Sequence, residues 1–233
     1  MNVNLKLVTI GIAAMIIFAG FAAFLVIAMN PVSAPIRVAC IGDSITEGSG
    51  YPQKLKQLLG VDYTVGNFGV SGSTVSLDSN LPYMNQTKFQ EAKNFDPDIV
   101  VIMLGTNDAN PEISPNENNF ETDYTQLITA FQQLEGQQLI WIVTSPPIFP
   151  NNSNYNNTYL ENNVIPQTDT VAQRMDLPTI NMYNALDSHP NYFMDGVHPD
   201  SNGATVIATQ VYDSITLPNG SPNTALFAAG YSG

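Results

Sequence analysis

Short continuous apolar runs alternate along the chain with longer stretches in which apolar residues recur every three or four positions. A continuous apolar run predicts a buried β-strand, whereas the periodic spacing predicts one face of a helix. We expect strands over residues 37–41, 63–68, 98–104, 139–143 and 179–182. We expect helices over residues 51–59, 119–135 and 159–175, and a last amphipathic helix with apolar residues from Ala204 to Ile215.

Strands that alternate with helices in this way predict a parallel sheet covered by helices on both faces, a three-layer α/β/α sandwich. The apolar run at 98–104 is typical of a strand buried on both faces. Pro166 is expected to kink or restart the third helix. The stretch from Gly72 to about Asn94 is rich in Ser, Asp and Pro, and we expect a loop there.

The amino-terminal part of the chain carries a separate signal. Residues 7–29 contain no charged side chain, and as a helix they extend about 35 Å, enough to cross the hydrocarbon core of a bilayer. We therefore expect a cytoplasmic stub at residues 1–6, a transmembrane anchor at 7–29 and a linker at 30–35. Lys6 precedes the anchor, which places the amino terminus in the cytoplasm and the folded domain outside.

Secretion after cleavage of a signal peptide is the alternative to an anchor. A signal peptide usually has an apolar region of only about 7–15 residues, followed by a small-residue cleavage site. The apolar run here is longer, and the nearest such site, Val32-Ser33-Ala34, is followed by Pro35. A buried core helix is a third option. We favour the anchor, followed by a folded domain at residues 36–216 and a flexible tail at 217–233.

Charge and cysteine content exclude several classes of partner. The net charge of −13, with only seven Lys and Arg residues, argues against nucleic acid and anionic lipid headgroups as ligands. The single cysteine, Cys40, lies in the first predicted strand, so neither an intrachain disulfide nor a cysteine metal cluster is possible.

Small or polar residues follow three of the predicted strands: Ser44, Gly72 and Asn107. Because parallel strands place their carboxyl ends at one edge of the sheet, these distant residues are expected to meet at a single site. The backbone N–H groups of Ser44 and Gly72, with the side-chain amide of Asn107, provide the donors that a tetrahedral oxyanion requires.

The loop before the last helix adds Asp195 and His198, three residues apart. A serine hydroxyl needs an adjacent base to become a nucleophile, and an imidazole titrates in the right range. The imidazole in turn needs a carboxylate at its other nitrogen, which Asp195 can supply. His189 is the competing base, but it lies further from the last helix, and we interpret it as a loop residue. Asp43 and Asp108 are assigned structural roles in turns.

Four sequence blocks together resemble the SGNH, or GDSL-type, hydrolases. In order, they are Gly42-Asp43-Ser44-Ile45-Thr46, Asn67-Phe68-Gly69-Val70-Ser71-Gly72, Gly105-Thr106-Asn107-Asp108 and Asp195-Gly196-Val197-His198-Pro199. The resemblance implies a flavodoxin-like sheet of about five parallel strands. It also implies Ser44 as nucleophile, His198 as base, Asp195 as its orienting acid, and Ser44, Gly72 and Asn107 as the oxyanion hole. The sequence from Asn67 to Thr74 is most similar to the sialate O-acetylesterase-like branch of these hydrolases, although we do not infer sialic acid as the substrate.

The leading functional hypothesis is an anchored, outward-facing serine esterase that removes short acyl groups, such as acetyl, from carbohydrate through an acyl-enzyme intermediate. A second hypothesis keeps the same triad but gives it lipid or thioester substrates, as in a lysophospholipase. A third is a non-catalytic carbohydrate-binding protein on the same fold. No cofactor or metal is expected, because the five site residues include one histidine, one carboxylate and no cysteine.

Overall fold

The computed structural model describes residues 34–114, 119–150, 154–217 and 220–224. The predicted anchor at 7–29 and the stub before it lie outside these residues. Among the residues that are described, no helix has both the length and the apolar character needed to cross a membrane.

Within the described ranges, parallel strands form one sheet in the order β2-β1-β3-β4-β5. This is the strand order of flavodoxin-like doubly wound proteins, so the predicted parallel sheet of about five strands is confirmed. The strands are β1 (Ile36–Gly42), β2 (Tyr63–Gly69), β3 (Ile99–Met103), β4 (Leu139–Val143) and β5 (Thr179–Ile180).

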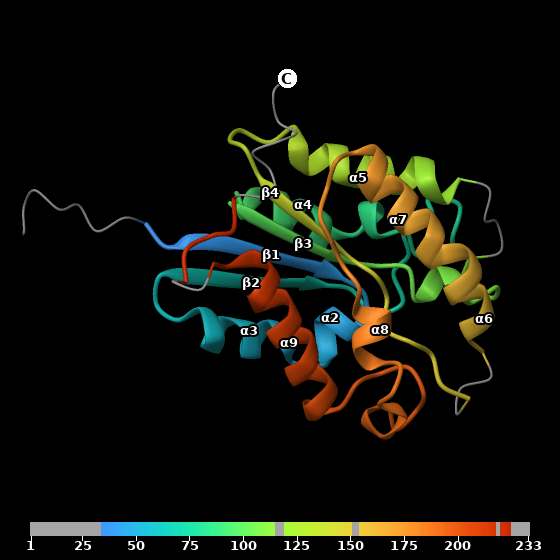
Figure 1. Cartoon of the computed structure of the whole chain (residues 1–233). Coiled ribbons are helices and arrows are strands. Elements are labelled where there is room, and N and C mark those ends of the chain that lie inside the picture. Colours follow the sequence, from blue (N-terminus) through green and yellow to red (C-terminus); the bar gives the residue numbers. More distant parts are fainter. Residues whose placement is uncertain (1–33, 115–118, 151–153, 218–219, 225–233) are drawn as a thin grey trace, which may run out of the picture. The chain divides into compact units, whose positions relative to one another are not determined.

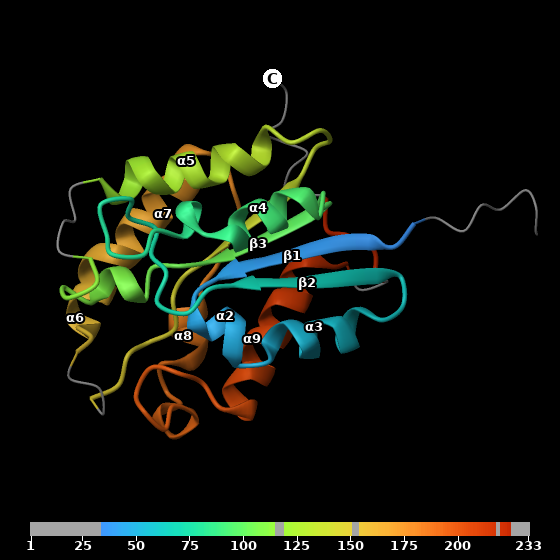
Figure 2. The same cartoon turned by 180° about the vertical axis from the view of Figure 1, so that it is seen from behind.

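Helices cover both faces of this sheet. Figures 1 and 2 show α2, α3 and α9 on one face, and α4, α5 and α7 on the other. The helices are α2 (Ser44–Gly48), α3 (Tyr51–Leu59), α4 (Thr87–Asn94), α5 (Phe120–Gln132), α6 (Asn157–Tyr159), α7 (Ile165–Arg174), α8 (Met182–Leu186) and α9 (Ser201–Ile215). Because each face is covered, the central strand β3 is buried along its whole length, as its continuous apolar run predicts.

The prediction of a loop up to about Asn94 is wrong for its last part, because residues Thr87–Asn94 form α4. Only Phe89 and Ala92 mark the buried face of this helix, and its other positions are polar. The Phe89 ring packs edge-on against Phe131 of α5, with ring centroids 5.8 Å apart. Tertiary packing of one aromatic ring therefore supports a helix whose sequence has too few apolar residues to show the period.

Two further predicted elements have different bounds. The strand expected at 179–182 contains only Thr179–Ile180, since the Asn181 side chain accepts a hydrogen bond from Asn184 N (2.9 Å) and so starts α8. The helix expected at 159–175 begins earlier, with α6, and passes through a π-helical turn at Leu160–Val164 before α7 starts. Pro166 lies in the first turn of α7, directly after this π-helical turn.

Part of the predicted tail is bound to the domain. Asn223 N donates to Ile215 O (2.8 Å), and Leu217 N donates to Ser221 O (2.7 Å). The hydroxyl of Tyr63, at the start of β2, donates to Gly220 O (2.9 Å). Residues 220–224 therefore lie against the last helix and the second strand.

The turn from β1 into α2 depends on the close approach of two strand ends to the helix. Gly42 and Gly69 are paired across β1 and β2. A Cβ atom on Gly69 would lie 2.3 Å from Glu47 N, and one on Gly42 would lie 1.9 Å from the Thr46 hydroxyl. Glycine at both positions therefore allows α2 to start immediately at the carboxyl end of β1.

Asp43 joins these two elements as the N-cap of α2. Its Oδ1 accepts a hydrogen bond from Ile45 N (2.9 Å), and the residue is only 1% exposed. Its Oδ2 is buried beside the Thr106 hydroxyl without a hydrogen bond of normal geometry. Burial raises the pKa of Asp43 to about 7, although the Ile45 N–H and the nearby His198 act in the opposite direction.

We predict that Asp43→Asn changes the pH dependence of stability. Asparagine keeps the capping oxygen but does not titrate. The folded wild type holds the Asp43 proton up to about pH 7, whereas an unfolded aspartate loses it near its ordinary pKa of 3.8. Between pH 4 and 8 the free energy of unfolding of the wild type should therefore fall by up to about 4 kcal/mol relative to Asp43→Asn.

Urea unfolding of both proteins at several pH values measures the difference between their free energies of unfolding. A pH-independent cost of the buried amide that Asp43→Asn introduces shifts this difference by a constant and does not affect its trend with pH. Asp62→Asn, at an exposed aspartate, is the matched control and should show no such trend. A difference between wild type and Asp43→Asn that stays constant from pH 4 to 8 would contradict the prediction.

Candidate active site

Ser44 and His198 meet at the carboxyl edge of the sheet although 154 positions separate them in the sequence. Ser44 is the first residue of α2, directly after the Gly42-Asp43 turn that ends β1. His198 lies in the loop that precedes α9. The Ser44 Oγ atom is 2.8 Å from His198 Nε2, the distance of a hydrogen bond that can transfer a proton.

Asp195 holds both the histidine ring and the loop that carries it. Its Oδ2 lies 2.6 Å from His198 Nδ1, and its Oδ1 accepts hydrogen bonds from Val197 N (3.0 Å) and His198 N (2.8 Å). Gly196 adopts a positive φ of 83°, which a glycine allows without strain. One carboxylate therefore fixes the backbone of residues 195–198 and the orientation of the imidazole together.

These contacts determine the charge of Asp195. Partial burial favours the neutral carboxyl, but the His198 N–H, the His198 ring and the Val197 N–H together outweigh it and lower the pKa of Asp195 to about 2. Asp195 is therefore an anion at neutral pH and accepts the Nδ1 proton of His198. In that tautomer Nε2 is the free base that faces the Ser44 hydroxyl.

The three expected oxyanion donors come from three different strand ends. Gly72 follows β2 with a φ of 80°, a conformation that favours glycine. Asn107 follows β3, is 2% exposed and donates through Nδ2 to Ser73 O (2.9 Å), which leaves a second amide hydrogen. In the described part of the chain, no hydrogen bond uses the Ser44 or Gly72 N–H. These groups are free to bind a negative oxygen.

Side chains from neighbouring blocks hold the loops that carry these donors. Asp108 accepts hydrogen bonds from Val75 N and Ser76 N (both 3.0 Å), which confirms its expected structural role. Glu47 of α2 accepts from Ser71 N (2.9 Å) and from the Ser71 hydroxyl. The Gly72 loop is therefore fixed from both sides.

Tyr155 is the residue near the site that the sequence did not reveal. Its hydroxyl donates to Asn107 Oδ1 (3.0 Å), so it helps to hold the Asn107 side-chain amide in one orientation. Burial, with Asp43 nearby, raises the pKa of Tyr155, which keeps this hydroxyl protonated as a donor. The residue lies in a polar stretch with no periodicity and no motif, so no sequence signal was available to find it.

His189, the competing base, lies elsewhere on the loop. Its ring stacks on Tyr192, with centroids 4.7 Å apart and an angle of 6° between the planes. The histidine that contacts Ser44 is His198. The interpretation of His189 as a loop residue agrees with this placement.

This arrangement has the parts that acyl transfer needs. A hydroxyl contacts a neutral imidazole, an ionised carboxylate stabilises the imidazolium that proton transfer forms, and free N–H groups lie nearby for the oxyanion. The side chains of His198 and Asp195 are 46% and 52% exposed, so the site is open to solvent.

Comparison with known proteins agrees with this geometry. A curated relative, an acetylxylan esterase from Xylanibacter ruminicola, is 34% identical over 205 residues, which cover 76% of this chain and 42% of the relative. The chain thus spans less than half the length of that protein.

Solved structures share the fold at lower identity. An acetyl xylan esterase superposes with a TM-score of 0.62 at 19% identity, covering 77% of this chain and all of the other chain. A lipase/acylhydrolase from Enterococcus faecalis gives 0.61 at 21% identity, over 76% and 93% of the two chains. The sequence model of one family matches residues 40–206, from β1 into α9. The chain therefore belongs to the GDSL-like lipase/acylhydrolase family.

Proposed function

We propose that this domain is a serine esterase that removes acetyl groups from carbohydrate hydroxyls through an acyl-enzyme intermediate. The observation that carries the proposal is the continuous contact from Ser44 Oγ to His198 Nε2 (2.8 Å) and from His198 Nδ1 to Asp195 Oδ2 (2.6 Å). Such a relay is the arrangement by which a serine becomes a nucleophile at neutral pH.

In the first half-reaction, His198 Nε2 takes the Ser44 proton while Oγ bonds to the acetyl carbon. The carbonyl electron pair moves onto oxygen, where the N–H groups of Ser44 and Gly72 and the Asn107 amide stabilise it. The intermediate then collapses: the bond from carbon to the sugar oxygen breaks, and His198 gives its proton to that oxygen. The alcohol leaves, and the acetyl group remains on Ser44.

In the second half-reaction, a water molecule takes the place of the alcohol. His198 accepts a proton from the water as the water oxygen bonds to the acyl carbon, and the same donors stabilise the new oxyanion. When the bond to Ser44 Oγ breaks, His198 returns the proton to that oxygen. Acetate leaves, and the enzyme is ready for another substrate.

Two observations support carbohydrate as the alcohol. The curated relative with 34% identity is named as an acetylxylan esterase. The catalytic side chains are about half exposed, so an ester group on a bulky saccharide reaches Ser44 without passing through a narrow channel. The similarity of residues 67–74 to the sialate O-acetylesterase-like branch remains a prediction.

The location of the enzyme is part of the proposal. Residues 7–29 are proposed to anchor the domain in a membrane with the active site outside, where polysaccharides are found. Alkaline carbonate extraction of membranes tests this: an anchored protein stays in the membrane fraction. A protein that instead lacks its first 30 or so residues by amino-terminal sequencing and appears in the medium is a cleaved, secreted enzyme.

The central test replaces the nucleophile. We predict that the full-length wild type releases acetate from acetylated xylan and hydrolyses p-nitrophenyl acetate, and that Ser44→Ala lowers kcat by at least about 10⁴-fold on both. Ser214→Ala, at a half-buried serine of α9 outside the active site, is the matched control and should retain full activity.

Equal rates for Ser44→Ala and wild type would refute the proposal. A wild type that is inactive and is not labelled at Ser44 by a fluorophosphonate would favour a non-catalytic binding protein. A steep preference for esters of C8 or longer acids over acetate would favour the lipid hydrolase instead.

A further prediction concerns the positioning residue Tyr155. Tyr155→Phe keeps the ring but removes the hydroxyl that donates to Asn107 Oδ1. Because the amide then loses its orienting partner, we expect kcat to fall about five- to tenfold with little change in KM. Steady-state kinetics on p-nitrophenyl acetate measure this split. Tyr212→Phe on α9 is the control, and an unchanged kcat in Tyr155→Phe would show that Tyr155 does not orient Asn107.

A further inference from the structure

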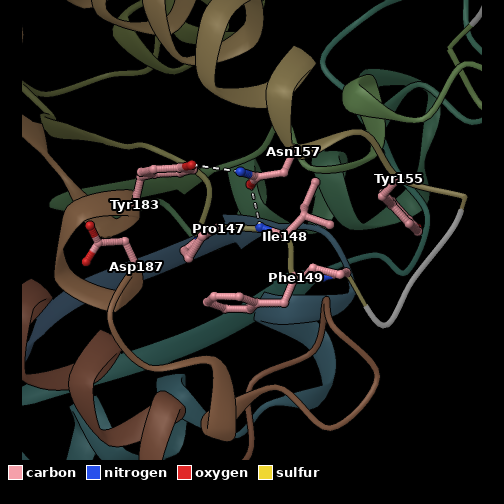
Figure 3. Close-up of a pocket in the computed structure, with 8 residues that line it drawn as sticks. Pro147, Ile148, Phe149, Tyr155, Asn157, Tyr183 and Asp187 are labelled. Carbon is pink, nitrogen blue, oxygen red and sulfur yellow. Dashed lines mark hydrogen bonds between the residues drawn. The ribbon is translucent and has the colours of Figure 1, made fainter.

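A pocket of about 340 Å³ opens next to the active site, between the segment that follows β4 and the helix α8 (Figure 3). Its volume lies in the range of sites that bind small molecules, roughly 300–1,000 Å³. The pocket is lined by Pro147, Ile148, Phe149, Pro150, Tyr155, Asn157, Tyr183 and Asp187. None of these residues belongs to the triad or the oxyanion hole.

The pocket shares two of its walls with the active site. On one side Tyr155 lines the pocket and donates its hydroxyl to Asn107, the oxyanion residue (3.0 Å). On the other side Phe149 N donates to Gly196 O (2.8 Å), inside the loop that carries Asp195 and His198. A molecule whose ester group lies at Ser44 can therefore extend directly into this pocket.

The wall of the pocket is held in place by its own hydrogen bonds. Asn157 Oδ1 accepts from Ile148 N (2.8 Å), and Asn157 Nδ2 donates to the Tyr183 hydroxyl (2.8 Å), as Figure 3 shows. These bonds connect the segment after β4 to α8 across the pocket. These two hydrogen bonds hold the walls of the pocket against each other.

The lining combines aromatic rings with one carboxylate. Phe149, Tyr155 and Tyr183 supply ring faces and edges, and Figure 3 shows Asp187 next to Tyr183. Asp187 is exposed, and in the described part of the chain its carboxylate has no hydrogen bond or ion pair. A carboxylate of this kind accepts charge-assisted hydrogen bonds from hydroxyl groups, while the rings contact the C–H groups of a sugar.

The charge of the pocket selects among sugars. Its lining contains Asp187 but no lysine or arginine, and the whole chain has a net charge of −13. An anionic sugar, such as a uronic or sialic acid, is repelled by this field, whereas a neutral pyranose is not. The carboxylate also disfavours an acyl chain in the pocket.

We propose that this pocket binds a neutral sugar unit on the alcohol side of the scissile ester, with Asp187 accepting hydrogen bonds from its hydroxyl groups. The inference rests on the proposed carbohydrate esterase function and adds to it a subsite, a ligand class and a specificity-determining residue.

The experiment compares two substrates in the full-length protein. Acetylated xylotriose reaches the pocket, whereas p-nitrophenyl acetate requires only the triad and the oxyanion hole. We expect Asp187→Asn and Asp187→Ala to lower the ratio of kcat/KM for acetylated xylotriose to that for p-nitrophenyl acetate about tenfold, mainly through KM. Asp213→Asn, at an exposed aspartate of α9, should leave the ratio unchanged.

A ratio that does not change in the Asp187 variants overturns the subsite, even where both rates fall together. A preference of the wild type for O-acetylated sialic acid over acetylated xylotriose overturns the choice of a neutral sugar. Binding separates these results from a failure of the proposed reaction. Calorimetric titration of Ser44→Ala with unmodified xylotriose should show binding that the added Asp187→Asn substitution weakens about tenfold, and equal affinities also overturn the subsite.

Discussion

The parallel sheet imposes the constraint on which the site depends. Because every strand runs in the same direction, the carboxyl ends of β1, β2 and β3 lie at one edge, and the residues that follow them meet there. Glycines at the ends of β1 and β2 allow α2 to begin in close contact with these strands. Ser44, the first residue of α2, therefore lies at the carboxyl edge of the sheet. The loop before α9 then needs to bring only one imidazole to the serine hydroxyl.

The environments of two carboxyl groups near this imidazole shift their pKa values in opposite directions. Asp195 accepts three hydrogen bonds at an exposed position and is ionised, with a pKa of about 2. Asp43 is buried with one capping hydrogen bond, and its pKa is raised to about 7. The environments of the two groups therefore make Asp195 the electrostatic partner of His198, and leave Asp43, the neighbour of Ser44, as a structural cap.

The sequence predicted those features that have a local pattern. The apolar runs located β1 to β4. Ser44, Gly72 and Asn107 stand in short blocks that follow three of these strands, and Asp195 and His198 stand in a short block before α9. The helix α4 was missed because a single buried ring, Phe89, supports it through contacts with a distant helix. Tyr155 was also missed, since it contacts Asn107 from a distant, polar segment without a motif. Asp187 was missed as well, because the pocket that it lines is built from segments far apart in the sequence. Apart from the local cap at Asn181 that ends β5 early, the features that escaped prediction depend on long-range packing.

The separation of Ser44 from His198 by 154 positions has a consequence for biosynthesis. The nucleophile leaves the ribosome early, together with the first strand, whereas its base is translated only just before the final helix. A nascent chain therefore carries an unactivated hydroxyl until the loop with His198 has been made, and Ser44 gains its base only when this last segment docks. The order of the elements thus keeps an unfinished chain without a complete triad.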